Sequence, residues 1–394
     1  MLFPRVHLAT VFLQTILIVL LLATAVSAQS HGKIIYQFDN PERNPVSGLI
    51  ADSAGNLYGL SFPNVVYELS PVAGGGWTFS IVQTFTQTQG DILIGRLLLD
   101  TAGNLYGTAE QGGSGNCGLV YELTPGPGGT WTEQSIFDFP AGGLSGCDPT
   151  NGVVMDAAGN LYGIAGGGAS DEGVVYQLTQ ANGVWSENLL FTLPGTQTAP
   201  TTPVAIDATG NLYFGNESDI FEVSPVPGGG WTANSIHTFH GSGNPIGNLS
   251  FDSAGNLYGT NQAGGTYRGG SAFQMKPVGD GSWTYAVIHN FGGVGNGKID
   301  GYYPESGLAF DTAGNAYGTT IGGGTFGVGT VFRLSLASNG KWSETRQFSF
   351  DGRNGGSPVP SPLLFYQGNF YGATAQGGIH GGEPKDGVAF QFTP

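Results

Sequence analysis

Apolar and polar positions alternate along short segments of this chain, and the segments recur in groups of four. Successive side chains of a β-strand point to opposite faces of its sheet, so short alternating runs bounded by Gly and Pro predict strands. The clearest group has its four expected strands at Arg96–Asp100, Asn104–Thr108, Leu119–Leu123 and Trp131–Phe139. Tight turns separate the first strand from the second and the third from the fourth, and a glycine-rich loop lies between the second and third.

One turn motif marks every group. It reads Asp-x-x-Gly-Asn-Leu-Tyr-Gly, with small changes, and its seventh copy, Gly368–Gly372, lacks the Asp. The motif residues are Asp52 and Asn56, Asp100 and Asn104, Asp156 and Asn160, Asp207 and Asn211, Asp252 and Asn256, Asp311 and Asn315, and Asn369. The spacing of 45 to 59 residues between successive Asn positions is typical of a four-stranded propeller blade. We number the repeats as units 1 to 7 after these copies.

A second regular spacing recurs in the fourth strands. Each of the six tryptophans stands eight residues before an apolar residue, Phe in five units and Leu193 in unit 3. An even offset puts both residues on one face of a strand. We interpret this pair as core between neighbouring units, with a tryptophan platform for ligands as the alternative.

The segments before the first unit and at the end of the last unit complete the count of strands. Lys33–Phe38 matches a fourth strand that lacks its tryptophan, and unit 7 stops after Val388–Phe392, a third strand. The fold class predicted is therefore all-β, a seven-bladed β-propeller of four-stranded antiparallel blades, closed by the N-terminal strand completing the last blade. We expect residues 29–394 to form this single domain.

The repeats resemble the choice-of-anchor tandem-repeat GloVer proteins, which are bacterial exported proteins. The resemblance rests on Asp311–Gly318, on Gly322–Gly324 and on Gly329–Leu334, and it covers essentially the whole chain after the signal. A weaker similarity to NHL-type and gluconolactonase-type propellers rests on the Asp-x-x-Gly-Asn turn. The resemblance implies an exported repeat protein, and it carries no activity.

Composition agrees with export. Residues 1–28 read as a signal peptide, with Arg5 before an apolar run and a small-residue cleavage site after Ala28. An uncleaved anchor is the alternative. Without the signal, 11 Lys and Arg face 28 Asp and Glu, a formal charge of −17. This charge disfavours nucleic acid and anionic lipid. We expect a monomer, secreted or held in the periplasm or at the cell surface, with no transmembrane segment after signal removal.

Two cysteines follow the signal. Cys117 lies in the glycine-rich loop of unit 2, and Cys147 lies in the connection into unit 3. Both positions fall on the same face of the expected propeller, and an even cysteine count in an exported chain favours pairing. We therefore predict a Cys117–Cys147 disulfide.

The repeated Asp and Asn positions admit a calcium interpretation, because their side chains offer hard oxygen ligands. They flank a tight turn, however, where Asp accepts backbone N–H groups and Asn and Gly tolerate positive φ. One Asp per unit also spreads the oxygens around a ring. We interpret the motif as structural and expect neither a metal nor a cofactor. His237 and His289, two residues before the apolar end of their strands, are expected to pack or face solvent.

The glycine-rich loops are where recognition is expected, since function on such scaffolds usually lies on loops. Their candidate ligand-binding residues are Tyr267, Arg268, Phe326, His380, Lys385 and Asp386. Such a mixture can stack on and hydrogen-bond a sugar or a peptide, so we predict a non-enzymatic binding module for a glycan or a surface protein. An equally supported interpretation is that these loops are flexible surface segments without a binding role.

Two other functions stay open. A metal-dependent, lactonase-like hydrolase or lyase would use Glu305, His240 and His380 around the channel mouth, where the first strands supply one carboxylate, Glu305. The chain has no recognisable nucleophile motif for such chemistry. The third possibility is a purely structural surface protein.

Overall fold

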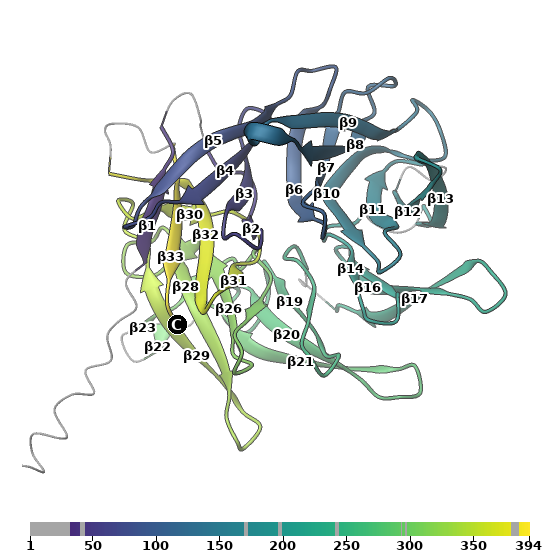
Figure 1. The fold of residues 1–394 in the computed structure, drawn as a ribbon. Coiled ribbons are helices and arrows are strands. Elements are labelled where there is room, and N and C mark those ends of the chain that lie inside the picture. The colour runs from purple at the N-terminus through teal and green to yellow at the C-terminus, as the bar shows by residue number, and fades with distance from the viewer. Residues whose placement is uncertain are drawn as a thin grey trace, which may run out of the picture.

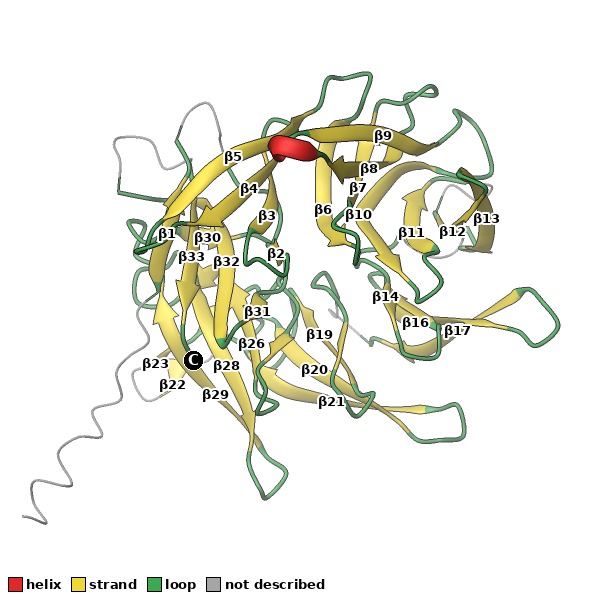
Figure 2. Cartoon of the chain, viewed as in Figure 1, coloured by secondary structure: helices red, strands yellow, loops and turns green. Residues whose placement is uncertain are grey.

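The structure is a computed structural model, and it describes residues 32–39, 44–168, 172–195, 199–240, 244–292, 294–295, 298–379 and 386–394. Nearly all of its regular structure is β. The described residues hold one short 3₁₀ segment, η1 (Pro127–Gly129), drawn red among the yellow strands in Figure 2. No helix in this part of the chain is apolar and long enough to cross a bilayer. The expected signal peptide, His380 and Lys385 lie outside the described residues.

The strands follow the expected groups of four. Units 1 to 3 comprise β2 (Ile50–Ala51), β3 (Leu57–Ser61), β4 (Val65–Pro71), β5 (Trp77–Thr84); β6 (Asp91–Leu99), β7 (Leu105–Gln111), β8 (Leu119–Pro125), β9 (Trp131–Asp138); β10 (Cys147–Met155), β11 (Leu161–Gly166), β12 (Val174–Ala181), β13 (Val184–Thr192). Units 4 and 5 comprise β14 (Ala205–Ile206), β15 (Leu212–Gly215), β16 (Asp219–Pro225), β17 (Trp231–Thr238); β18 (Ser250–Phe251), β19 (Leu257–Asn261), β20 (Ser271–Pro277), β21 (Trp283–Asn290).

The last two units carry extra short strands. Unit 6 and the connection before it hold β22 (Val294–Gly295), β23 (Lys298–Ile299), β24 (Gly301–Tyr302), β25 (Ala309–Phe310), β26 (Ala316–Thr320), β27 (Gly322–Gly323), β28 (Thr330–Leu336), β29 (Trp342–Ser349). Unit 7 holds β30 (Gly356–Pro358), β31 (Leu364–Tyr366), β32 (Asn369–Gln376), β33 (Val388–Phe392), and β1 (Lys33–Gln37) begins the described chain.

Most units form separate antiparallel sheets. Units 1, 4, 5 and 6 each give a four-stranded sheet, whereas units 2 and 3 share an eight-stranded sheet. That larger sheet is joined by a single parallel pairing, Gly152 with Arg96. In Figure 1 the sheets follow one another around a common centre, and the labelled strands β2, β6, β10, β14 and β31 lie on the inner side.

The first and last strands of the described chain share one sheet. β1 pairs antiparallel with β33 through Lys33–Gln391 and Gln37–Val388, and β32 and β30 extend the same sheet. The pairing covers the β33 edge, which would otherwise present unpaired backbone groups.

The turn motif forms the hairpin between first and second strands. In unit 1, Asp52 Oδ1 accepts the N–H groups of Ala54 and Asn56, and its Oδ2 accepts the Asn56 amide and the Tyr58 hydroxyl. The same four bonds recur at the other five Asp positions. Each carboxylate is thus occupied by donors of its own turn.

The degenerate seventh copy turns differently. Phe365 pairs with Phe370 and Tyr366 with Asn369, which leaves the two-residue turn Gln367–Gly368. Both turn residues have positive φ, 48° and 76°. Positive φ at both positions matches the twist of a two-residue hairpin, so this copy forms its turn without the Asp.

The core lies between neighbouring sheets. The indole of Trp131 meets the motif tyrosine Tyr58 of the preceding unit at a ring-centroid distance of 5.9 Å. The same contact joins Trp231 to Tyr162, Trp283 to Tyr213, and Trp342 to Tyr258. The tryptophans are half-buried, which agrees with packing between units.

Candidate functional site

The loops between second and third strands, glycine-rich in all units except 1 and 4, are anchored to the ends of the fourth strands. In unit 2, the Phe139 N–H donates to the Gly118 carbonyl over 3.0 Å. Equivalent bonds hold Phe38, Phe85, Leu193, Phe239, Phe291 and Phe350 to the loop of their own sheet. The second-to-third loops and the fourth-to-first connections therefore lie together at one end of the sheets, and we call this end the loop face.

Neighbouring units also meet on the loop face. The Tyr303 N–H in the connection into unit 6 donates to Gly269 in the unit 5 loop over 2.8 Å, and the Ser357 N–H donates to Val328 over 3.0 Å. Between units 2 and 3, the Asp148 N–H donates to Cys117 over 2.9 Å. These bonds fix each loop against the connection that follows it.

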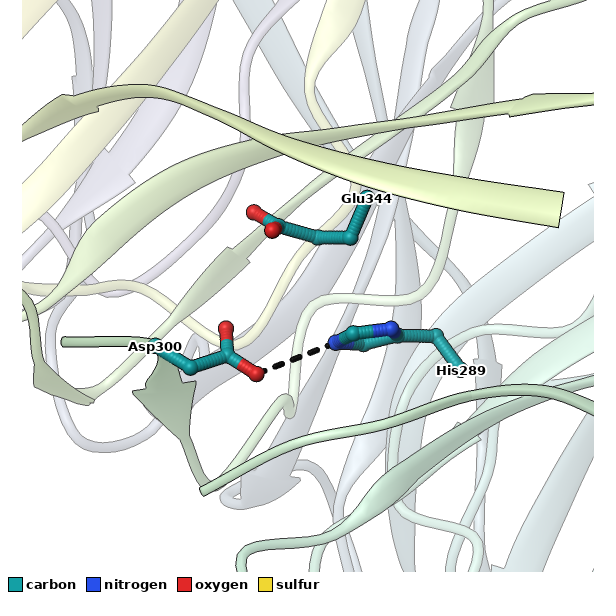
Figure 3. A group of neighbouring side chains, drawn as sticks. All are labelled: His289, Asp300 and Glu344. Atoms are coloured by element: carbon teal, nitrogen blue, oxygen red, sulfur yellow. Dashed lines mark hydrogen bonds and ion pairs between the residues drawn. The ribbon is translucent and has the colours of Figure 1, made fainter. Parts of the chain in front are cut away.

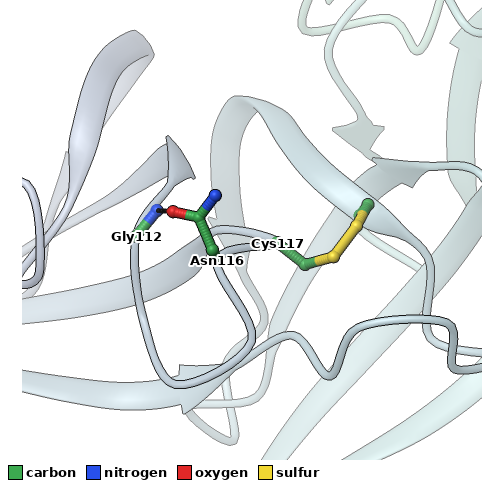
Figure 4. The surroundings of a disulfide bond; sticks show 4 residues. Gly112, Asn116 and Cys117 are labelled. Carbon is green, nitrogen blue, oxygen red and sulfur yellow. Dashed lines mark hydrogen bonds between the residues drawn. A yellow bond between two sulfur atoms is a disulfide. The ribbon is translucent and has the colours of Figure 1, made fainter.

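The predicted disulfide lies at this junction and is confirmed. Cys117 and Cys147 are bonded, with Cα atoms 4.6 Å apart. Figure 4 shows the bond beside the unit 2 loop, where the Gly112 N–H donates to Asn116 Oδ1 over 3.3 Å. Hydrogen bonds hold the corresponding segments together where unit 5 meets unit 6 and where unit 6 meets unit 7. At the junction of units 2 and 3, the disulfide adds a covalent link.

Tyr267 and Phe326 occupy equivalent loop tips in units 5 and 6. The preceding residue is held in the same way in both loops: the Thr266 N–H donates to Asn290 Oδ1, and the Thr325 N–H donates to Ser349 Oγ. Their side chains are 58% and 60% exposed. Two ordered loops thus present an aromatic ring to solvent.

The other candidate ligand residues are placed unevenly. Arg268 is exposed beside Tyr267, with a left-handed backbone of φ 62°. Asp386 is half-buried before β33. Phe326 lies one unit away from Arg268 along the loop face, while nothing is described for His380 and Lys385.

Sequence reasoning missed most of the apolar surface on the loop face. All five exposed aromatic side chains of the described residues lie there: Phe62, Tyr267, Tyr302, Tyr303 and Phe326. Ile92, Leu144 and Ile379 are exposed on the same face. A search for every aromatic residue in the loops and connections would also have found Phe62, Tyr302 and Tyr303. Exposed aliphatic side chains also lie elsewhere, among them Val226 and Val278, so the aromatic rings are what distinguishes the loop face.

A cavity of about 510 Å³ lies at the centre of the molecule. The first strands β2, β6, β10, β14, β18 and β31 contribute its lining, which is mostly aliphatic. Arg96 is the one charged residue among its described lining residues, with Asn151 and Asn248 as polar neighbours. Arg96 is exposed to the open cavity, and desolvation by the surrounding strands lowers the pKa of its guanidinium. Sequence reasoning missed Arg96 because it stands in an otherwise apolar strand.

Glu305 lies in the connection into unit 6, outside the lining of the central cavity. Its Oε1 accepts a hydrogen bond from Gln262 Nε2 of the unit 5 loop. Burial raises the pKa of Glu305, and the Gln262 bond opposes that effect. His240 is exposed after β17, and within the described residues no contact joins it to Glu305.

The expectation that His289 only packs or faces solvent needs correction. Its Nε2 lies 3.1 Å from Asp300 Oδ2, and both side chains are largely buried. His237 does pack as expected, stacked on Tyr285 with ring centroids 3.9 Å apart.

Solved structures share this fold at low identity. Virginiamycin B lyase from Staphylococcus aureus matches with a TM-score of 0.57 and 12% identity, over 92% of this chain and 100% of that one. The extracellular domains described as those of a hybrid two component system, BT3049, and of a one component system, BT4673, both from B. thetaiotaomicron, match with TM-scores of 0.56 and 0.53 and with 13% and 15% identity. The matches cover 93% and 91% of this chain and 41% and 40% of those chains. These likenesses support a propeller-like fold.

A search of curated proteins finds no match to this chain. At the family level, the description "Gloeobacter/Verrucomicrobia repeat" matches residues 24–220 and 214–394, nearly the whole sequence and all of its repeats. This confirms the resemblance drawn from the turn motif and the Gly-Gly loops, and the chain belongs to the Gloeobacter/Verrucomicrobia repeat family.

Proposed function

We propose that this chain is an exported binding module built as a closed seven-bladed propeller. The blade count divides the eight-stranded sheet at its single Gly152–Arg96 pairing and takes β31, β32, β33 and β1 as the seventh blade. Seven equivalent bonds between fourth strands and loops support this division. Residues 1–28 are the signal and residues 29–394 the domain in this proposal.

One observation carries the binding role: all exposed aromatic side chains of the described chain lie on the loop face. An aromatic ring offers a large apolar surface at low entropic cost, and it can stack on a sugar or pack against a protein. The loops that carry Tyr267 and Phe326 are held by backbone hydrogen bonds, so binding would not have to order these two loops. A glycan or another surface protein is the ligand class that fits.

The disulfide and the charge of the chain fit a location outside the cell. The disulfide supports an oxidising compartment. The formal charge of −16 for the whole chain disfavours polyanions as ligands. We propose a monomer that is secreted or displayed at the surface.

Thermal unfolding with soluble oligosaccharides and purified surface proteins tests this proposal. A ligand that binds only the folded state raises the unfolding midpoint. We expect one ligand class to raise it in the native chain and not in the double variant Tyr267→Ala and Phe326→Ala.

The matched control replaces two exposed residues at the opposite end, Val226→Ala and Val278→Ala. It should respond as the native chain does. A ligand shift that survives loss of both aromatic tips would contradict binding through this face, as would the absence of any shift across the panel.

A further inference from the structure

Three side chains that the proposed binding role does not use converge between the outer strands of units 5 and 6. His289 comes from β21, Asp300 from the connection after β23, and Glu344 from β29. One ligand atom of each lies within 4.8 Å of the others. Figure 3 shows the imidazole and both carboxyl groups directed toward a shared space.

The internal repeat shows that paired aromatic rings fill this space at two other junctions. At these junctions, the residue two positions before the apolar end of one fourth strand contacts a residue of the fourth strand in the next unit. That second residue stands two positions after the tryptophan. Tyr36 stacks on Phe79 in this way, with ring centroids 5.1 Å apart, and His237 stacks on Tyr285. At the same register, His289 has Glu344 as its partner in place of an aromatic ring.

A third position of the repeat is supplied by the connection between units. Gln89 donates to Glu133 over 3.1 Å, and Ser145 donates to Glu187 over 2.5 Å. Gln89 lies two residues before Asp91, which pairs with Gln111 at the end of β7. Ser145 lies two residues before Cys147, which pairs with Gly166 at the end of β11. Each facing glutamate thus accepts a hydrogen bond from a neutral donor in the connection.

Asp300 stands at the same register in the connection into unit 6, because Tyr302, two residues later, pairs with Gly322. A carboxylate here replaces the neutral donor of the other two junctions. Two carboxylates facing each other in a partly buried space repel unless a cation lies between them. The Asp300 side chain is 12% exposed and that of His289 is 21% exposed.

We propose that His289, Asp300 and Glu344 form a binding site for a divalent transition-metal ion of the zinc type. Imidazole nitrogen with carboxylate oxygen suits such ions, whereas calcium and magnesium favour all-oxygen sites. With metal–ligand bonds of about 2.0–2.2 Å, tetrahedral ligand atoms lie roughly 3.4 Å apart. The 3.1 Å between His289 Nε2 and Asp300 Oδ2 matches this spacing, and Glu344 closes the remainder by side-chain rotation.

Three protein ligands leave a fourth position for water or for an oxygen of a bound molecule. The ion would also link β21 to β29 and to the intervening connection, at the boundary between two sheets. The Gly292 N–H donates to Gly301 within this connection, and Tyr303 joins it to the loop that carries Tyr267. The inference does not rest on the proposed ligand of the loop face.

Titration of the EDTA-treated, dialysed full chain tests the site. We expect one equivalent of Zn²⁺ by calorimetry, and one equivalent of Co²⁺ with visible absorption bands of a nitrogen and oxygen environment. His289→Ala should abolish binding, and Asp300→Asn and Glu344→Gln should each weaken it at least tenfold. These two isosteric variants keep the shape of the site if His289→Ala perturbs folding.

His237→Ala is the matched control, because it removes a histidine at the same register one unit earlier. It should bind Zn²⁺ as the native chain does. The proposal is overturned if the native chain binds neither ion, if binding survives in His289→Ala, or if Ca²⁺ binds more tightly than Zn²⁺. A pH-dependent ion pair of His289 and Asp300 with no metal effect on the unfolding midpoint also overturns it.

Discussion

The indole of Trp77, in the first unit, meets the ring of Tyr371, in the last, at a centroid distance of 6.1 Å and an interplanar angle of 73°. It is the same tryptophan-to-tyrosine contact that joins units 1 and 2, 3 and 4, 4 and 5, and 5 and 6. The contact between chain ends thus repeats the contact between neighbours, as expected for units equivalent around a ring.

Trp77→Ala should destabilise the whole domain. The substitution removes a half-buried indole from the junction of the first and last units, and we expect a loss of about 2–4 kcal/mol in unfolding free energy. Urea unfolding followed by tyrosine and tryptophan fluorescence measures it. Val184→Ala, at an exposed apolar position beside Trp185, should cost less than about 0.5 kcal/mol. Equal effects of the two substitutions would argue against a stabilising junction.

Deletion of Lys33–Phe38 should cause aggregation. The segment covers the β33 edge and supplies the fully buried Phe38, so its removal exposes both strand edge and core. Light scattering and size-exclusion chromatography give the readout. Phe38→Ala, which keeps the strand, should lower stability by about 3–5 kcal/mol. A monomeric, cooperatively folding deletion variant would rule out closure by this strand.

Replacing both cysteines by serine should lower stability without changing the fold. The disulfide closes a loop with a sequence separation of 30, for which chain entropy gives about 3–4 kcal/mol. The effect should appear in the native chain on reduction and be absent in the double variant treated identically. Peptide mapping under non-reducing conditions checks the pairing, and free thiols at Cys117 and Cys147 would contradict it.

Stability should fall in strongly acidic solution because of the turn motif. Burial tends to raise the pKa of Asp156 and Asp252, but hydrogen bonds from Asn, Tyr and backbone groups of the turn lower it below the ordinary 3.8. Asp207 and Asp311 behave alike. A group with a depressed folded pKa stabilises the fold above its unfolded pKa, and this stabilisation is lost as pH falls through the folded pKa. The unfolding midpoint should therefore be level near pH 6 and drop below about pH 4.

Asp252→Asn tests the cause of that drop. The amide keeps the shape of the turn but accepts fewer hydrogen bonds and does not titrate. We expect a lower midpoint at pH 6 and a smaller further decrease between pH 5 and pH 3 than in the native chain. An unchanged acid response would assign the effect to other carboxylates.

The sequence by itself determined the features that depend on near neighbours in the chain. Asp52, Asn56 and Tyr58 make their hydrogen bonds within six residues of one another, so the repeated motif was enough to predict each hairpin. The alternation of apolar and polar residues and the eight-residue spacing from each tryptophan to an apolar residue likewise predicted the fourth strands. The disulfide was predictable because the repeat put both cysteines on one face.

Only the tertiary structure decided which residues meet across units. His289, Asp300 and Glu344 come from two fourth strands and a connection, and nothing in their local sequence indicates a shared space. Arg96 faces the central cavity because several first strands converge there. Such contacts depend on the angle and register between neighbouring sheets, which are set by packing of many side chains at once and not by the spacing of residues along the chain.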